Sequence, residues 1–395
     1  MNTQSGTMRL PRRGLYIFLA IVALGGIPAG KAAAEPLYLS EWIFRVDFPE
    51  GYAYTGGDLE KRFSFSSGNG GTVDLVAYDP GVYENPEALA DDIRARLKNR
   101  GDMSTFEYRG KKAVFFTLDF SGSVPLNGWG LCVELDGEQG KPRPLLAALA
   151  YGPAARPELQ IYHLSALDSI APTQGDFYAP GPVTEFSYPR GEPVRLSLAG
   201  TGLSAVFRAG EAEAAQALVD REFSVLTGYA DSPLWKEAWT RFYRAIYRDS
   251  YDRLADAAFI LERSWNREQS SPAEDPSRDL ARFLLEWVQG FAYERDFMGS
   301  DFVNLITAAT EGRGDCDSRA MLWAILLQHG NVPAAIMVSR EYSHAMGLVD
   351  LEGPGARFDL NGKKMIVAET TAVVPLGLIG ASVSDPLYWV GIPLP

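Results

Sequence analysis

Three residues in the C-terminal third of the chain have side chains suited to covalent acyl transfer. Cys316 lies in the run Gly-Asp-Cys-Asp, His344 lies in Ser-His-Ala, and Glu369 lies in Ala-Glu-Thr-Thr. A thiol nucleophile, an imidazole base and a carboxylate that orients the imidazole are the parts that this chemistry needs. The sequence therefore predicts Cys316, His344 and Glu369 as catalytic residues.

Cys316 is expected at the start of a long buried helix. Asp315 is suited to the N-cap, and the run Ala320–Leu327 contains no polar residue, which indicates burial on nearly all sides. A thiol at a helix N-terminus faces unpaired N–H groups, which lower its pKa from about 8.5 to roughly 3.5–7.5. We expect such a low pKa at Cys316, with neither Asp315 nor Asp317 facing the thiol, because a nearby carboxylate would raise the pKa.

His344 and Glu369 are expected on neighbouring strands. The apolar runs at 342–349 and 364–371 are typical of strands. If they pair as an antiparallel hairpin, with His344 opposite Thr370, the imidazole lies beside Glu369. The sheet would then present a base and an acid at the end that faces the cysteine helix.

In this order, the three motifs resemble the bacterial transglutaminase-like superfamily. The segment Trp287–Tyr293 is similar to the helix that precedes the cysteine in that superfamily. The resemblance covers Asp279–Thr371 and implies a papain-like fold with a Cys-His-Asp/Glu triad. Glu369 is a departure from animal transglutaminases, which have Asp there, whereas many bacterial members carry Glu.

Acyl transfer also needs hydrogen-bond donors for the developing oxyanion. The backbone N–H of Cys316 is the expected first donor, and the side chain of Gln289 or Tyr293 is the expected second. The sequence has no paired-cysteine or His-x-x-x-His spacing, so we expect neither a metal nor a cofactor.

The expected reaction is attack of Cys316 on a peptide or carboxamide carbonyl, with a thioester intermediate that water or an amine resolves. Hydrolysis is slightly favoured because water is abundant at an open site, and cross-linking of proteins is the alternative. The expected partner is a peptide or protein substrate, including cell-wall peptides. Two further alternatives are a non-catalytic peptide-binding module of the cell envelope and a structural protein in which Cys132 pairs with Cys316. The sequence leaves the oligomeric state open.

Residues 1–34 have the features of a secretory signal peptide. Arg12 and Arg13 precede an apolar run at 15–27, and Ala32–Ala34 provide a small-residue cleavage signal. The apolar run is shorter than the ~20 residues that span a bilayer, and an uncleaved anchor is the alternative. We expect a periplasmic or secreted protein, without a further membrane segment. The net charge of −13 argues against nucleic-acid or anionic-membrane partners.

The patterns along the whole chain predict an α+β protein. Residues 35–172 are expected to form a strand-rich module of unknown ligand, with one central helix and one closing helix. Their order resembles the PsbP-like α+β sandwich. Residues 173–210 are expected to be a linker and a hairpin, with a short strand at 183–188. Residues 211–395 are expected to form the transglutaminase-like domain, a helix bundle packed on an antiparallel sheet, with helices at 211–227, 234–249, 251–265 and 279–293.

Overall fold

The computed structural model describes residues 37–395, except 40–41, 43, 138–139, 269–274 and 296–299. The predicted signal peptide, residues 1–34, lies outside the described residues. The described chain combines helices with antiparallel sheets, so the α+β class is confirmed. In the described part, no helix is long and apolar enough to span a membrane.

The first half of the chain is built on a seven-stranded antiparallel sheet. A short hairpin of β1 (Leu37–Leu39) and β2 (Phe44–Val46) precedes it. Its strands, in spatial order, are β3 (Tyr52–Gly57), β4 (Arg62–Ser67), β5 (Thr72–Tyr78), β9 (Leu145–Pro153), β8 (Pro125–Glu134), β7 (Lys111–Ser121) and β6 (Met103–Tyr108).

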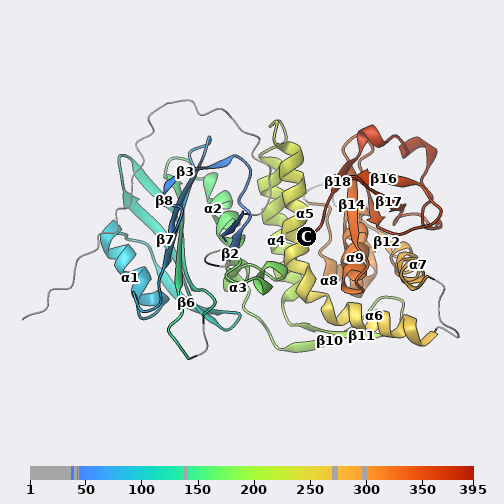
Figure 1. Ribbon diagram of the computed structural model, residues 1–395, viewed down its shortest axis with the longest axis horizontal. Helices are drawn as coiled ribbons and strands as arrows, with labels where there is room; N and C mark the ends of the chain where they lie inside the picture. The colour runs from blue at the N-terminus through green and yellow to red at the C-terminus, as the bar shows by residue number, and fades with distance from the viewer. Residues whose placement is uncertain (1–36, 40–41, 43, 138–139, 269–274, 296–299) are drawn as a thin grey trace, which may run out of the picture. The chain divides into compact units, whose positions relative to one another are not determined.

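The helices α1 (Pro86–Leu97) and α2 (Leu159–Asp168) cover opposite faces of this sheet (Figure 1). Because successive side chains along a strand point to opposite faces of the sheet, β9 contributes residues to the hydrophobic cores on both faces. Leu146 packs in the core on the α2 side, and Leu149 packs in the core on the α1 side. The sequence Asn85-Pro86 is typical of a helix start, and Asn85 is the N-cap of α1, since its Oδ1 accepts a hydrogen bond from the N–H of Ala88 at 2.9 Å.

The segment predicted as a linker is folded into short elements. It contains a 3-10 helix, η1 (Gly175–Tyr178), and a helix, α3 (Pro182–Ser187), followed by a hairpin of β10 (Pro193–Ser197) and β11 (Ser204–Arg208). The predicted strand at 183–188 is wrong. Pro182 sets a helical φ at the first position, and both the N–H and the hydroxyl of Thr184 donate to the buried Asp168 carboxylate, at 2.8 and 2.7 Å. The predicted hairpin is confirmed.

Helix α5 (Trp235–Arg253), in the second half of the chain, makes side-chain contacts with the first half. Arginines on α5 bind backbone and acid groups of the first half. Arg244 makes a two-pronged ion pair with Asp47, with both N–O distances at 2.8 Å, and Arg248 donates to the carbonyl oxygen of Ile170 at 2.8 Å. The described residues from Leu37 to Pro395 pack as one compact unit.

The second half has a five-stranded antiparallel sheet with helices packed against it. The strand order is β16 (Arg357–Leu360), β17 (Lys363–Ala368), β15 (His344–Val349), β14 (Ala334–Ser339) and β18 (Val390–Ile392). Short 3-10 helices, η2 (Ala381–Val383) and η3 (Pro386–Tyr388), precede β18. The remaining helices are α4 (Glu211–Thr227), α6 (Ala255–Glu268), α7 (Pro276–Gln289), α8 (Leu305–Glu311) and α9 (Cys316–His329).

The central helix α9 lies in the core between the sheet and the other helices (Figure 1). Every residue from Ser318 to Leu327 is buried, as the apolar run predicts. Trp323 is fully buried, and its ring lies directly over Gly347 of β15, where an added Cβ would come within 2.5 Å of the ring. The glycine therefore allows the helix to lie close against the sheet.

The pairing of β15 with β17 differs from the predicted hairpin. Gly347 pairs with Ala368, which shifts the register by one residue from the prediction that placed His344 opposite Thr370. The chain between the two strands also forms an additional strand, β16, which pairs with β17 at the edge of the sheet. The shift leaves His344 at the start of β15 and Glu369 just past the end of β17.

Candidate active site

Cys316 is the first residue of α9. Asp315 is the N-cap, as predicted, and its Oδ1 accepts a hydrogen bond from the N–H of Ser318 at 2.8 Å. The preceding residues Arg313–Gly314 pair with Ala292–Tyr293 as two parallel bridges. Cys316 is thus held between a capped helix and a short sheet, with 6% of its surface exposed.

His344 and Glu369 are hydrogen-bonded to each other. The distance between His344 Nε2 and Glu369 Oε2 is 2.8 Å. Burial opposes ionisation of Glu369, but the hydrogen bonds from His344 and Thr371 outweigh it and leave the pKa of the carboxyl below its ordinary value. Glu369 is therefore a carboxylate that fixes the imidazole and leaves the second ring nitrogen, Nδ1, for other partners.

Glu369 and the loop that follows it are held by residues that no sequence motif indicates. The N–H and hydroxyl of Thr371 both donate to Glu369 Oε1, at 2.7 and 2.6 Å. The buried guanidinium of Arg319, on α9, donates to the carbonyl oxygens of Thr370 and Phe291, at 3.4 and 2.9 Å. Arg319 is the one charged residue in the buried stretch Ser318–Leu327 of α9. A single cation beside an apolar run could have indicated a buried arginine that bonds backbone carbonyl groups.

Cys316 and His344 line the same cavity, which has a volume of about 280 Å³. Its polar part also includes Asp317 and Ser339. The remaining lining residues lie on α4 and α5, before α8, at the N-cap of α9 and in the turn before β15: Phe223, Leu226, Trp239, Phe242, Arg295, Ser300, Asp301, Phe302, Asp315, Arg340 and Ser343. The structure thus brings the predicted nucleophile and base to one solvent-reachable space.

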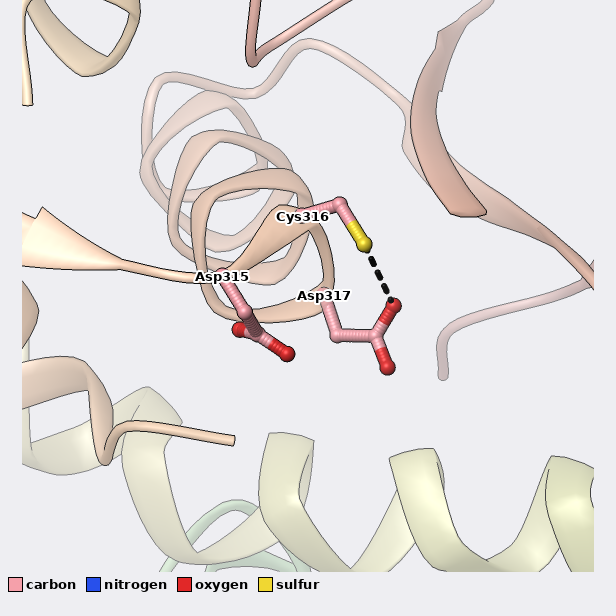
Figure 2. Close-up of side chains that lie close together, drawn as sticks. All are labelled: Asp315, Cys316 and Asp317. Carbon is pink, nitrogen blue, oxygen red and sulfur yellow. Dashed lines mark hydrogen bonds between the residues drawn. The ribbon is translucent and has the colours of Figure 1, made fainter. Parts of the chain in front are cut away.

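The environment of the thiol contradicts one expectation. Asp317, which we expected to face away, lies with its Oδ1 at 3.6 Å from Cys316 Sγ (Figure 2). Burial raises the pKa of the Cys316 thiol above its ordinary value, and the carboxyl groups of Asp317 and Asp315 raise it further. The predicted low-pKa thiol is therefore wrong for this state, in which the thiol proton is directed to Asp317.

Asp317 is itself embedded in the protein. The hydroxyl of Tyr243, on α5, donates to Asp317 Oδ2 at 2.8 Å. Burial raises the pKa of the Asp317 carboxyl, and the Tyr243 hydrogen bond offsets part of that rise. A helix-start acid that could be explained by the helix dipole alone is thus a direct neighbour of the reactive sulfur.

Asp315, Cys316 and Asp317 are the cluster that could hold a metal ion in the described part of the chain. Each offers one ligand atom, and these atoms lie within 4.8 Å of one another. Their side chains already bond inside the protein. Asp315 receives hydrogen bonds from Ser318, and Asp317 receives one from Tyr243. These internal bonds account for the cluster, so no metal site is inferred from it.

The two predicted oxyanion donors have different surroundings. Gln289 Nε2 donates to the carbonyl oxygens of Glu369 and Val374, at 2.8 and 3.0 Å, so both amide hydrogens are used to anchor the loop after β17. Tyr293 lies beside the thiol, and burial and the nearby Cys316, to which it is hydrogen-bonded, raise the pKa of its phenol to about 12. A protonated phenol can donate, so Tyr293 fits the role and Gln289 does not.

The other cysteine and histidines lie elsewhere. Cys132 is buried on β8, in the core beneath α1, and both cysteines are free thiols, so the Cys132–Cys316 disulfide alternative is not supported. His163 is fully buried on α2. His329 stacks on Tyr251 with ring centroids 4.0 Å apart, and its Nε2 lies 2.9 Å from the Tyr251 carbonyl oxygen. Neither histidine lines the cavity around Cys316.

Comparison with known proteins gives structural likenesses only. No protein-family model and no curated protein matches the chain. The solution structure of the cyanobacterial PsbP (CyanoP) from Synechocystis sp. PCC 6803 is similar with a TM-score of 0.27 and 12% identity, over 38% of this chain and 98% of CyanoP. LpqN of Mycobacterium tuberculosis, described as involved in cell envelope biogenesis, is similar with a TM-score of 0.25 and 11% identity, over 35% of this chain and 90% of LpqN.

A third similar structure is a protein from Bacteroides thetaiotaomicron VPI-5482, with a TM-score of 0.20 and 10% identity, over 54% of this chain and 76% of that protein. A PsbP protein is thus among the similar solved structures, but a TM-score of 0.27 does not confirm the predicted PsbP-like fold. At these TM-scores the likenesses carry no conclusion about activity.

Proposed function

We propose that the protein is a thiol enzyme that forms a thioester on Cys316 with a peptide or carboxamide substrate. The observation that carries the proposal is the His344–Glu369 hydrogen bond of 2.8 Å at the edge of the cavity that Cys316 also lines. A nucleophile, a base and an acid that orients the base are the parts required for covalent acyl transfer. The transglutaminase-like, papain-like architecture of residues 211–395 belongs to the same proposal.

The first half of the reaction transfers one proton and exchanges one bond. Glu369 holds His344 Nε2–H, so Nδ1 accepts the proton of the Cys316 thiol. The sulfur attacks the carbonyl carbon, and the oxyanion forms near the Cys316 N–H and the Tyr293 hydroxyl. His344 then gives the proton to the leaving nitrogen, the C–N bond breaks, and a thioester and a free amine result.

The thioester is resolved by a second attack with the same roles. Water, deprotonated by His344, gives a carboxylic acid and restores the thiol. A primary amine in place of water gives a new amide and corresponds to cross-linking. Hydrolysis is favoured because the cavity opens to solvent, and it makes the protein a peptidase or amidase.

The raised pKa of the thiol makes general-base catalysis necessary. A thiol that stays protonated at neutral pH must lose its proton as it attacks, so the reaction depends on His344. A binding module of the cell envelope, the alternative from a different class, would not depend on His344 in this way.

The proposal places the protein outside the cytoplasm. The features of residues 1–34 support export to the periplasm or beyond, where secreted proteins and cell-wall peptides are the available substrates. We assign residues 35–172 to a PsbP-like positioning module, and residues 173–210 to the connection between the two halves.

An activated ester tests the acyl-transfer step directly. Incubation with p-nitrophenyl acetate should place one acetyl group on Cys316, located by peptide mass mapping, and the Cys316→Ala variant should stay unmodified. With the primary amine monodansylcadaverine added, the amounts of free acetate and of acetylated monodansylcadaverine are then compared. The ratio shows whether water or the amine is the acyl acceptor. Absence of acetylation at Cys316 would remove the enzyme proposal and leave the binding module.

A further inference from the structure

The cavity beside Cys316 has an apolar wall that the proposed chemistry does not use. Two helices each contribute a pair of residues three positions apart, which share one helix face. Phe223 and Leu226 come from α4, and Trp239 and Phe242 come from α5. Phe302, which precedes α8, completes the wall.

The wall is a connected aromatic surface with buried and open members. Phe242 and Phe302 are buried, at 4% and 2% exposure, and their ring centroids are 6.1 Å apart. The ring centroids of Phe223 and Phe242 are 6.5 Å apart. Phe223, Leu226 and Trp239 are half-buried. The buried rings therefore form a floor, and the half-buried side chains present apolar surface to the cavity.

The acids of the cavity are engaged with neighbouring groups. Asp301 Oδ2 accepts a hydrogen bond from Arg295 Nε at 2.6 Å, Asp315 Oδ1 accepts one from the Ser318 N–H at 2.8 Å, and Asp317 accepts one from Tyr243. A cationic substrate group would have to displace these partners to pair with any of the three acids. An apolar group meets the aromatic wall without such a cost.

The size of the cavity limits what it can hold. A volume of about 280 Å³ is just below the roughly 300–1,000 Å³ of typical small-molecule sites. This volume suits one large side chain and its adjoining peptide group, rather than a folded domain. The wall residues line the same cavity as Cys316 and His344, so a side chain on the wall lies in the same small space as the proposed reacting groups.

We propose that this apolar wall is a specificity pocket for an uncharged aromatic or large aliphatic side chain next to the carbonyl that Cys316 attacks. The inference rests on the proposed function and names its substrate class: peptides with an apolar residue at the acylated position. Burial of such a side chain against the wall supplies binding energy that steers the substrate to the thiol.

Paired alkylating reagents test the pocket without a known substrate. N-benzyl-2-chloroacetamide, 2-chloroacetamide and 2-chloro-N-[2-(trimethylammonio)ethyl]acetamide share one reactive group and differ in the attached group. The rate of alkylation at Cys316, followed by peptide mass mapping, should be roughly tenfold or more higher for the benzyl reagent than for 2-chloroacetamide. The ammonium reagent should show no such gain.

Variants assign the preference to the wall. The benzyl preference should fall towards unity in Trp239→Ala and in the milder Phe223→Leu, which keeps an apolar side chain if the first variant does not fold. Phe259→Ala is the matched control, because Phe259 lies on α6 with 57% exposure and does not line the cavity. It should keep the wild-type preference.

The outcomes separate the pocket from the enzyme proposal. Equal rates for the benzyl reagent and 2-chloroacetamide in the wild type, a preference for the ammonium reagent, or an unchanged preference in both wall variants would overturn the pocket. A benzyl preference without acetylation of Cys316 by p-nitrophenyl acetate would keep the pocket and remove the enzyme. A protein that no reagent alkylates at Cys316 would contradict both.

Discussion

Replacement of Glu369 by glutamine tests how the acid controls the imidazole. In the wild type, Glu369 Oε1 accepts two hydrogen bonds from Thr371, and Oε2 faces His344 Nε2. In Glu369→Gln the amide oxygen would stay with the two Thr371 donors, which turns the NH₂ group towards Nε2. That nitrogen must then accept, so the ring proton moves to Nδ1, where it blocks transfer of the thiol proton from Cys316.

The size of the effect follows from the geometry. A carboxylate and an imidazolium 2.8 Å apart attract each other by about 6 kcal/mol at an effective dielectric constant of about 20. That dielectric constant is appropriate because the side chains are only 18% and 12% exposed. Loss of the whole attraction in the transition state corresponds to about four orders of magnitude in rate. With partial compensation by solvent, we expect a loss between about 10² and 10⁴.

The assay is acetylation of Cys316 by p-nitrophenyl acetate under single-turnover conditions. Glu352→Gln, at an exposed position, is the control for the same chemical change and should react at the wild-type rate. Circular dichroism and thermal melting should show a folded Glu369→Gln protein. A folded variant that reacts within threefold of the wild type would refute the orienting role of Glu369.

Three further predictions concern the surroundings of the site. Asp317→Asn removes the carboxylate beside the Cys316 thiol, so the pH midpoint of iodoacetamide labelling should fall by about 1–3 units; an unchanged or higher midpoint would show that Asp317 does not control the thiol. Gln289→Ala removes the two hydrogen bonds to the partly buried carbonyl oxygens of Glu369 and Val374 and should lower the free energy of unfolding by about 1–3 kcal/mol in urea melts. An unchanged stability would contradict this anchoring role. Burial raises the pKa of Glu50 from 4.5 to about 7, so its contribution to stability is full below about pH 4.5 and is lost as the pH rises through about 7. Glu50→Gln should therefore raise the melting temperature at pH 8 and change it little at pH 4, and the same shift at both pH values would contradict the assignment.

The parts of the fold that the sequence predicts best are those with a strong local signal. The buried helix α9 and its cap come from the apolar run and Asp315. The strands β3 and β6, which are the two edges of the seven-stranded sheet, have only a weak signal in the sequence. Edge strands expose much of their surface, so they lack the apolar alternation that marks an inner strand.

The register of β15 and β17 could not be predicted from the hairpin argument. A simple hairpin has the shortest connection, whereas the chain between β15 and β17 forms an additional edge strand, Arg357–Leu360. His344 and Glu369 still meet, because both lie at strand ends where a shift of one residue is absorbed by the loop. The prediction that the two strands pair was therefore enough to bring His344 and Glu369 together, even though the predicted register was wrong.

Other features of the site depend on packing that local patterns do not contain. The orientation of Asp317 towards the thiol depends on Tyr243, which is 74 residues away in the chain. The apolar wall of the cavity joins helix faces that, in the sequence, have the spacing of ordinary core residues. Such contacts become visible only when α4, α5 and α9 are placed together.

The central claim is that His344 accepts the proton of Cys316. Its most direct test is the rate of acetylation of Cys316 by p-nitrophenyl acetate at neutral pH in the wild type and in His344→Ala. Because burial and Asp317 keep the thiol protonated, the account predicts a rate at least about 10²-fold lower in the variant. Equal rates in the two folded proteins would contradict the account, since the thiol would then react without its base.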